Sequence, residues 1–213
     1  MRLILIRHAE SKHTQKNIIA DIHGCTGLTA HGFEQAQVLA NRFLVTGELD
    51  SCRTMLYSPV LRASQTAQVL ADIIKFDTLL HDDDLRELNP GVADGISSQQ
   101  YAETFGKFDL ISFPHRPFAP HGESWSMFIS RVQNTLERLA SQCKNQTIVA
   151  VTHAGFIVAT FLTLFDIPRP GTGSYLNPMY TSLTEWSKSN NTWQLEKYND
   201  TLHLIMPMQE LKP

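Results

Sequence analysis

Three apolar segments of this sequence are each followed by side chains that can bind or transfer a phosphoryl group. Arg7 and His8 come directly after the apolar run that starts at Leu3. Arg62 lies just after "MLYSPV", and His153 directly follows "TIVAVT". A guanidinium presents a planar fork of N–H donors that matches the oxygens of a phosphate monoester, and neutral histidine is a competent nucleophile. The combination predicts phosphoryl transfer through a phosphohistidine.

Each of these side chains has a distinct expected role in such a reaction. Arg7 and Arg62 would hold the phosphate, and their positive charge disfavours protonation of His8, which keeps its imidazole neutral. His153 would donate hydrogen bonds to the phosphoryl oxygens as charge shifts in the transition state. These four side chains lack a proton donor for the leaving oxygen, so a carboxylic acid is also required.

The elements that position these side chains alternate between strands and helices. Continuous apolar runs predict buried strands, and helical spacing of apolar residues predicts helices that cover the resulting sheet on both faces. The fold class is therefore α/β, a three-layer sandwich with a mostly parallel central sheet. A hairpin turn at Asn190-Asn191 predicts one antiparallel strand at a sheet edge. The expected strands are 2–7, 55–57 and 147–152, and the expected helices are 29–46, a helix from Pro59 with Ser58 as its N-cap, and 124–142.

In such sheets, ligands bind outside the carboxyl ends of the strands. The predicted strand ends deliver Arg7 and His8, then Ser58 and Arg62, and finally His153 and Ala154 to one rim. Ser58 and Ala154 are accordingly expected to contact a substrate. We expect a single domain over residues 1–213, with a loop-rich cap segment at about 81–123.

Composition narrows the class of protein. The 213 residues carry a formal net charge of −3 without a long basic run, which argues against nucleic-acid binding. No apolar stretch approaches the roughly 20 residues of a membrane span, and the N-terminal apolar run is too short for a signal peptide. The three cysteines lack disulfide or metal-site spacing, so we expect a cytoplasmic protein without a bound metal or cofactor. The oligomeric state is left open, a homodimer included.

Five motifs in order carry a resemblance to a known family. They are "RHAES", "SPVLRASQTA", "LRELNPGVADG", "HGESW" and "VTHAGF", and together they resemble the histidine phosphatase superfamily, with its phosphoglycerate mutase-like fold, over nearly the whole chain. The resemblance implies that His8 is the phosphorylated nucleophile and that Arg7, Arg62 and His153 complete the phosphate pocket. It also implies that Glu87 is the general acid and base, because Gly91 and Gly95 follow it at the spacing of the branch with a Glu donor.

The sequence departs from the family pattern after the nucleophile. The family usually has Asn six residues after it, where this chain has Thr14, whereas Asn17 and Gly24 keep the family's Asn-to-Gly spacing. We therefore expect a three-residue insertion before Asn17, which makes Asn17 the phosphate-binding amide, and we expect His23 and Gly24 to contact the substrate. Pro90 and Ala93 replace aromatic residues common in the family, which changes the expected wall of the pocket.

The resemblance implies a metal-independent phosphatase that acts on a small phosphate monoester. Two alternatives remain: a phosphoglycerate-type mutase with the same pocket, and a non-catalytic protein that binds phosphorylated ligands. The substrate is not identified. Asp82, Asp83, Asp84 and Asp94 are alternative acids, and His115, Arg116 and His121 either line the mouth of the pocket or are solvated. Glu10 is expected to be structural, and the histidines expected to have no catalytic role are His13, His31, His81 and His203.

Overall fold

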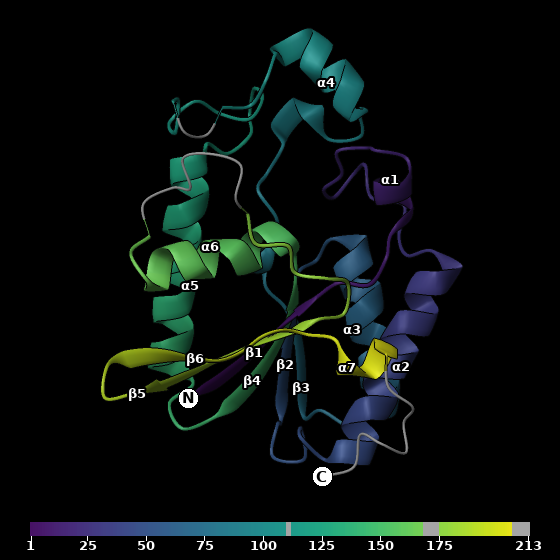
Figure 1. Cartoon of the computed structure of the whole chain (residues 1–213), viewed down its shortest axis with the longest axis vertical. Helices are drawn as coiled ribbons and strands as arrows, with labels where there is room; N and C mark the ends of the chain where they lie inside the picture. The colour runs from purple at the N-terminus through teal and green to yellow at the C-terminus, as the bar shows by residue number, and fades with distance from the viewer. Residues whose placement is uncertain (110–111, 168–174, 206–213) are drawn as a thin grey trace.

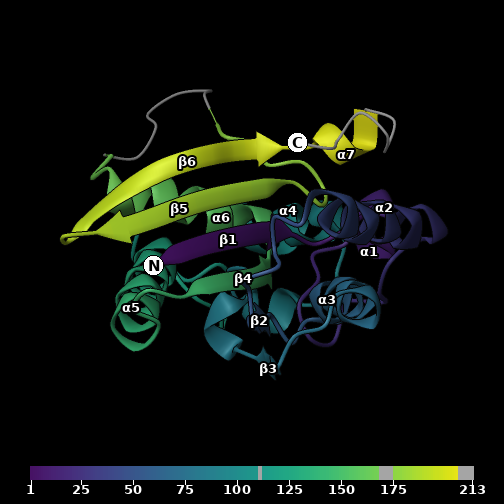
Figure 2. The same cartoon turned by 90° about the horizontal axis from the view of Figure 1, so that it is seen from below.

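A mixed six-stranded sheet of order β3-β2-β4-β1-β5-β6 organises the chain (Figures 1 and 2). The structure is a computed structural model that describes residues 1–109, 112–167 and 175–205. Within these ranges the strands are β1 (Arg2–Arg7), β2 (Thr54–Tyr57), β3 (Thr78–His81), β4 (Thr147–Thr152), β5 (Leu183–Ser189) and β6 (Thr192–Asp200).

The strand directions confirm the predicted α/β class. β1, β4, β2 and β3 are mutually parallel, whereas β5 is antiparallel to β1. β6 returns antiparallel to β5 and forms the outer edge. The predicted antiparallel strand thus lies one position in from the edge, because the hairpin adds a second strand outside it. Asn190 and Asn191 have φ values of 46° and 62°, which is the left-handed conformation that a tight hairpin turn needs.

Helices cover both faces of the sheet. α2 and α3 lie on one face, and α5 and α6 lie on the other (Figure 2). The described helices are α1 (Lys12–Gln15), α2 (Ala30–Thr46), α3 (Leu61–Ile73), α4 (Ser98–Phe105), α5 (Trp125–Gln142), α6 (Ala154–Leu164) and α7 (Leu202–Ile205), with the short 3₁₀ turns η1 (Asp83–Leu85) and η2 (Gly91–Ala93).

The alternation of side chains along β1 explains its continuous apolar run. Leu3 and Leu5 pack in the hydrophobic cluster beneath α5 and α6, whereas Ile4 and Ile6 pack in the cluster beneath α2 and α3. Successive residues of a strand point to opposite faces, so both sets are buried when helices cover both faces. This double burial leaves the backbone of β1 little freedom and fixes the direction in which its last residues leave the sheet.

Most predicted helix boundaries are confirmed. Thr29 accepts a hydrogen bond from the Gly32 amide as the N-cap of α2, and Gly47 ends that helix with φ 65°. Ser124 caps α5 by accepting from the Met127 amide. The prediction that Ser58 caps the next helix is wrong. α3 begins two residues later than expected, after Val60 as its N-cap, and no side chain caps it.

The segment between β3 and α5 forms a layer over the carboxyl edge of the sheet (Figure 1). It contains η1, η2 and α4, and residues 110 and 111 of the expected cap lie outside the described residues. Its hydrophobic cluster of Ala93, Tyr101 and Ala119, with Phe118 packed against them, is separate from the two sheet cores. We call the described part of residues 82–123 the cap.

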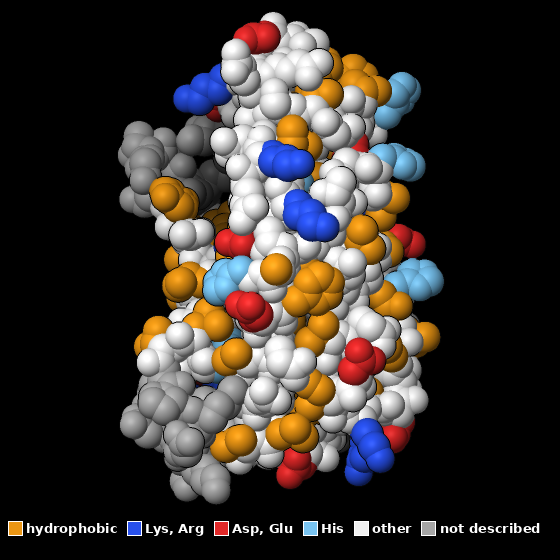
Figure 3. Space-filling model, turned by 90° about the vertical axis from the view of Figure 1, so that its right-hand side faces the viewer, with side chains coloured by type: hydrophobic (Ala, Val, Ile, Leu, Met, Phe, Trp, Pro, Cys, Tyr) orange, Lys and Arg blue, Asp and Glu red, His pale blue; other side chains and the backbone are white. Residues whose placement is uncertain are grey.

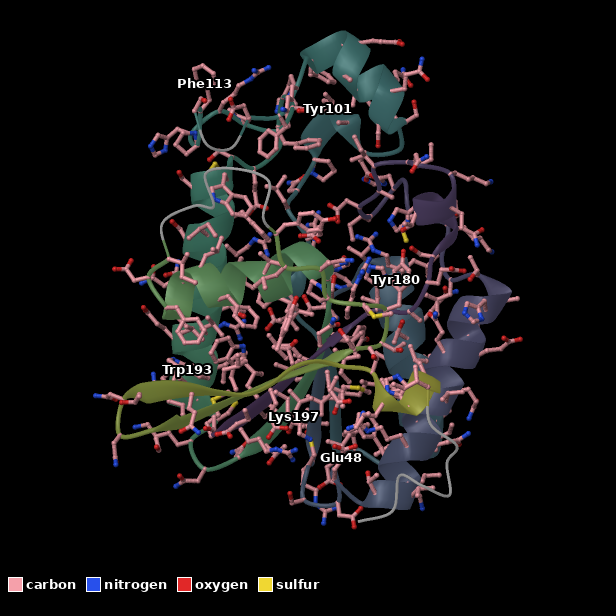
Figure 4. All side chains as sticks on the ribbon, viewed as in Figure 1. Glu48, Tyr101, Phe113, Tyr180, Trp193 and Lys197 are labelled. Carbon is pink, nitrogen blue, oxygen red and sulfur yellow. The ribbon has the colours of Figure 1, made fainter. Side chains whose placement is uncertain are left out.

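Ion pairs join α2 to the C-terminal hairpin away from the cap. The buried Arg42 donates to both Glu48, at 2.6 Å, and Asp200, at 2.7 Å. Lys197 also lies 3.6 Å from Glu48 (Figure 4). Removal of one partner would leave an unpaired buried charge, so this network ties β6 to α2.

None of the described helices is long and apolar enough to cross a membrane. On the face drawn in Figure 3, hydrophobic side chains lie among polar, charged and histidine side chains.

Replacement of Phe128 by Ala tests how firmly α5 is held against the sheet. Phe128 is completely buried in the cluster that also contains Leu85 of η1. The substitution is expected to lower the free energy of unfolding by about 3–5 kcal/mol, measured by urea denaturation. Phe113→Ala is the control, because Phe113 is 58% exposed on the cap (Figure 4). That change is expected to stay within about 0.5 kcal/mol. Equal losses of unfolding free energy in the two variants would contradict the packing of Phe128 in the core.

Candidate active site

The carboxyl ends of three adjacent strands meet at one point. β2, β4 and β1 are consecutive in the sheet, with Tyr57 paired to Val151 and Arg7 paired to Thr152. The next residue of each strand is therefore brought to the same place. His8 and His153 face each other there with ring centroids 5.2 Å apart, as expected for neighbouring parallel strands.

The His8 imidazole is buried, with each nitrogen in a defined environment. Nδ1 lies 2.8 Å from the Ala9 carbonyl, an acceptor only, so Nδ1 carries the proton. Nε2 then has a lone pair and accepts from Arg62 Nε at 3.1 Å. Burial, followed by the positive charges of Arg62 and Arg7, holds the pKa of His8 well below its ordinary value. His8 is thus a neutral imidazole with its nucleophilic nitrogen turned toward a guanidinium.

The two guanidinium groups are fixed by backbone oxygens. Arg62 Nη1 donates to the Ala20 carbonyl at 2.9 Å. Arg7 Nη1 donates to the Pro178 carbonyl at 2.5 Å, and its guanidinium carbon lies 4.0 Å from the centre of the Tyr180 ring (Figure 4). Each arginine keeps further N–H donors that these contacts do not use.

Thr181 supports the end of β1 from the side of the C-terminal hairpin. Its amide donates to the Arg7 carbonyl at 3.0 Å, and its hydroxyl lies 3.0 Å from Nε2 of the buried His203. Burial, followed by the charge of Arg42, lowers the pKa of His203 to about 4. Thr181 therefore links the end of β1 to the neutral, buried imidazole of His203.

The second imidazole at the strand ends is held by Ser58. Nε2 of His153 lies 2.8 Å from the Ser58 hydroxyl, while Nδ1 has no hydrogen-bond partner among the described residues. Burial and the charge of Arg62 hold the pKa of His153 well below its ordinary value. This contact with His153 explains why Ser58 does not cap α3.

Glu87 leaves η1 and meets the N-terminus of α6. Its Oε2 accepts from the Gly155 amide at 2.8 Å, and its Oε1 accepts from the Leu88 amide at 3.1 Å. A Cβ on Gly155 would lie 2.2 Å from Oε1, so only glycine leaves room for this carboxyl group. The Arg131 side chain of α5 donates to the Glu87 carbonyl at 3.1 Å and forms an ion pair with Glu123. Hydrogen bonds from α5 and α6 thus fix the position of Glu87.

These groups open onto one cleft between the sheet and the cap. Its volume is about 360 Å³, at the small end of the range for sites that bind small molecules. Of the predicted site residues, those that line it are Arg7, His8, Arg62, Glu87 and Ala154. The predicted residues Ser58 and His153 are completely buried and are not among the lining residues, although the His153 ring contacts the ring of His8.

Comparison with known proteins identifies the family of this chain. Residues 3–201 match the family model of the histidine phosphatase superfamily, branch 1. The chain belongs to the histidine phosphatase superfamily. It is 24% identical over 212 residues to the metal-independent phosphoserine phosphatase of Arabidopsis thaliana, covering 95% of this chain and 82% of that one.

Solved structures of similar proteins share the fold. YhfR of Bacillus stearothermophilus superposes with a TM-score of 0.79 at 22% identity, over 95% of this chain and 98% of that chain. A mutant phosphoserine phosphatase of Entamoeba histolytica in complex with phosphoserine gives a TM-score of 0.73 at 23% identity, over 96% of this chain and 99% of that chain.

The loop predicted to supply further contacts in this histidine phosphatase lines the cleft, but through Ile18, Ile19 and Ala20 rather than through the predicted residues. Asn17 and His23 are exposed, and neither they nor Gly24 lines the cleft. Asp94 fixes the loop by accepting from the amides of His23 and Gly24, at 2.8 and 2.9 Å. A Cβ on Gly24 would lie 2.5 Å from Asp94 Oδ1. The Ala20 carbonyl of this loop accepts from Arg62, so the loop also orients that arginine.

Two residues that sequence reasoning did not place in the site line the cleft instead. His13 and Thr14 lie on α1, and the His13 ring centroid is 6.4 Å from that of His8. Burial, followed by the charges of Arg62 and Arg7, lowers the pKa of His13 to about 4, and its Nδ1 has no partner among the described residues. The sequence contains one signal for this placement. Thr14 stands six residues after His8, where the family usually has its Asn.

The remaining candidates fall outside the cleft. Glu10 accepts from the Thr29 hydroxyl at 2.7 Å, as expected of a structural residue. His115, Arg116 and His121 are exposed on the cap and do not line the cleft. Across the described ranges, no three His, Cys, Asp or Glu side chains are grouped so that they could hold a metal ion.

The buried neutral imidazoles predict that stability falls on acidification. The folded pKa of His203 is about 4, whereas an unfolded histidine has about 6.5. Between these values the unfolded chain binds more protons, so this contribution is complete above pH 6.5 and is lost as the pH falls toward 4. We expect His203→Gln to reduce the loss between pH 7 and pH 4.5 by about 2–3 kcal/mol, measured by urea denaturation.

His31→Gln is the control for this measurement, because the His31 side chain is 63% exposed. Its loss of stability between the two pH values is expected to equal that of the unaltered protein. A loss of equal size in all three proteins would show that His203 does not titrate in this way.

Proposed function

We propose that this histidine phosphatase hydrolyses small phosphate monoesters through a phosphohistidine on His8. The observation that carries the proposal is the neutral His8 ring, whose Nε2 lone pair faces Arg62 in a cleft that Arg7 also lines. A phosphate dianion bound by the two guanidiniums would present its phosphorus atom to that nitrogen. Neutral histidine is nucleophilic without prior loss of a proton.

In the first step, His8 Nε2 forms a bond to phosphorus as the ester P–O bond breaks. Glu87 donates its proton to the leaving oxygen and becomes a carboxylate. Arg7 and Arg62 stabilise the charge on the transferring phosphoryl group. If the Ser58 hydroxyl donates to Nε2 of His153, Nδ1 of His153 carries a proton that can be donated to a phosphoryl oxygen.

In the second step, water attacks the phosphohistidine. The Glu87 carboxylate removes a proton from that water, the P–N bond breaks, and phosphate leaves with His8 again neutral. The position of Glu87 in the cleft suits it to both proton transfers. It is the only carboxylate among the described residues that line the cleft. The neighbouring Asp82 and Asp94 are engaged by Arg138 and by loop amides.

Two further parts of the proposal concern the surroundings of the reaction. The cap forms the outer wall of the cleft, and together with the sheet it makes one unit that encloses a small phosphorylated substrate. The thiols of Cys25, Cys52 and Cys143 are free. Free thiols support a reducing compartment such as the cytoplasm.

His8→Ala tests the nucleophile. We expect loss of turnover and loss of the phosphoenzyme, measured as acid-labile, alkali-stable labelling after rapid mixing with ³²P-labelled phosphate monoester. His31→Ala is the control and should label like the unaltered protein. Labelling that persists in His8→Ala would place the nucleophile elsewhere.

The same phosphoenzyme separates hydrolysis from the alternatives. A phosphatase transfers the label to water. A mutase would transfer it to added phosphoglycerate instead, and a non-catalytic binding protein would acquire no label at all. Release of the label as inorganic phosphate at the same rate with and without phosphoglycerate is the expected result.

Gly155→Ala tests the position of the proton donor. The added methyl group would displace the Glu87 carboxyl, so we expect kcat for an alkyl phosphate to fall about 10²-fold or more, with the circular dichroism spectrum unchanged. Glu87→Gln is expected to give a similar loss. The double variant should lose no more than either single variant, because both changes remove the same proton transfer. Multiplicative losses would show that Gly155 acts independently of Glu87.

A further inference from the structure

The cleft has a charged floor and an apolar outer wall. Arg7, His8 and Arg62 form the floor at the strand ends. The wall is formed by side chains with no charge and no side-chain hydrogen-bonding group, which are Ile18, Ile19, Leu88, Pro90, Phe108 and Phe118. A phosphate bound at the floor would therefore direct the organic part of its ester toward this wall.

The aromatic part of the wall is held by the cap. Phe118 stacks on Tyr101 with ring centroids 4.3 Å apart, and Phe108 packs edge-on against Phe118 at 4.8 Å. The Tyr101 hydroxyl also donates to the Phe118 carbonyl at 2.6 Å. Tyr101 is itself a residue of α4, in the upper part of the cap as drawn in Figure 4. Contacts within the cap thus hold both aromatic rings of this apolar wall in place.

The described residues that form this wall offer no cation to a carboxylate in the organic part of a substrate. Arg7 and Arg62 are the only arginines or lysines among the described residues that line the cleft, and both belong to the floor. Nearby, Arg116 donates to the Phe105 carbonyl, and Arg86 forms an ion pair with Asp21. A substrate carboxylate would lose its hydration against the wall and gain no cation from it, which is unfavourable.

The geometry points to phosphate monoesters of apolar alcohols as the preferred substrates of this site. This inference rests on the proposed function and narrows it to one substrate class. The organic group is uncharged and apolar, small enough for a cleft of about 360 Å³, and packs on Phe108 and Phe118. This substrate class differs from the charged amino acid ester named for the Arabidopsis relative.

The test uses three esters whose leaving groups are all primary alcohols, so that leaving-group chemistry is closely matched. They are 2-phenylethyl phosphate, glycerol 1-phosphate and O-phosphoserine. We expect kcat/KM for 2-phenylethyl phosphate to exceed that for glycerol 1-phosphate about 10- to 100-fold, as burial of a phenyl group provides. O-phosphoserine should be the poorest of the three.

Variants of Phe108 test whether the apolar wall causes the preference for the phenylethyl ester. Phe108→Ala should lower kcat/KM for 2-phenylethyl phosphate about tenfold and should lower it less for glycerol 1-phosphate, which has no apolar group to pack on the ring. Phe108→Leu, which keeps an apolar side chain, should retain most of the activity. Phe108→Arg should raise activity on O-phosphoserine by supplying a cation. Phe113→Ala is the matched control, since Phe113 is exposed on the cap and does not line the cleft.

Each outcome bears on one of the two proposals. If phosphoserine is hydrolysed as well as or better than the phenylethyl ester, the inference is wrong while the phosphatase function stands. The inference is also wrong if Phe108→Ala and Phe113→Ala have equal effects on the phenylethyl ester. If none of the three esters yields inorganic phosphate or labels His8, the phosphatase function itself is wrong.

Discussion

The burial of two neutral imidazoles beside two guanidinium groups is the constraint on which the site depends. Such a cluster is unfavourable if any of the rings becomes charged, so the surrounding structure must exclude water and hold each donor in place. The strands meet this requirement. Three consecutive parallel strands end in register, and both faces of β1 are covered by helices. The same burial that stabilises the sheet keeps the His8 imidazole neutral, with a lone pair on Nε2.

The groups around this cluster are positioned mainly by backbone atoms. Carbonyl oxygens of Ala20 and Pro178 orient the two arginines, and the Gly155 amide orients Glu87. Thr66 joins two of these parts, because its hydroxyl accepts from the Ala9 amide and donates to the Arg62 carbonyl. Backbone contacts of this kind depend on how elements pack rather than on the identity of one side chain. The geometry of the cleft is therefore a property of the whole fold.

The strand ends and the main helices can be predicted from the sequence. Strands buried on both faces appear as continuous apolar runs, and helix ends are recognised by their capping residues. Thr29, Gly47 and Ser124 act as expected at helix ends. Ser58 does not, because its hydroxyl bonds to His153, 95 residues away, and no local pattern contains that contact. The path of the chain after His8 is equally non-local. α1 places His13 and Thr14 at the cleft and Asn17 outside it, which depends on a loop held by Asp94 from the cap.

The cap has a hydrophobic cluster of its own, separate from the two clusters that bury the sheet. Changes in the side chains of this cluster therefore need not disturb the strands that carry His8 and His153, whereas Leu85 of the cap belongs to the core of the sheet. Such a division lets natural selection alter what the protein recognises while its chemistry is preserved. It also gives protein engineers a compact region in which libraries can be made without loss of the folded scaffold.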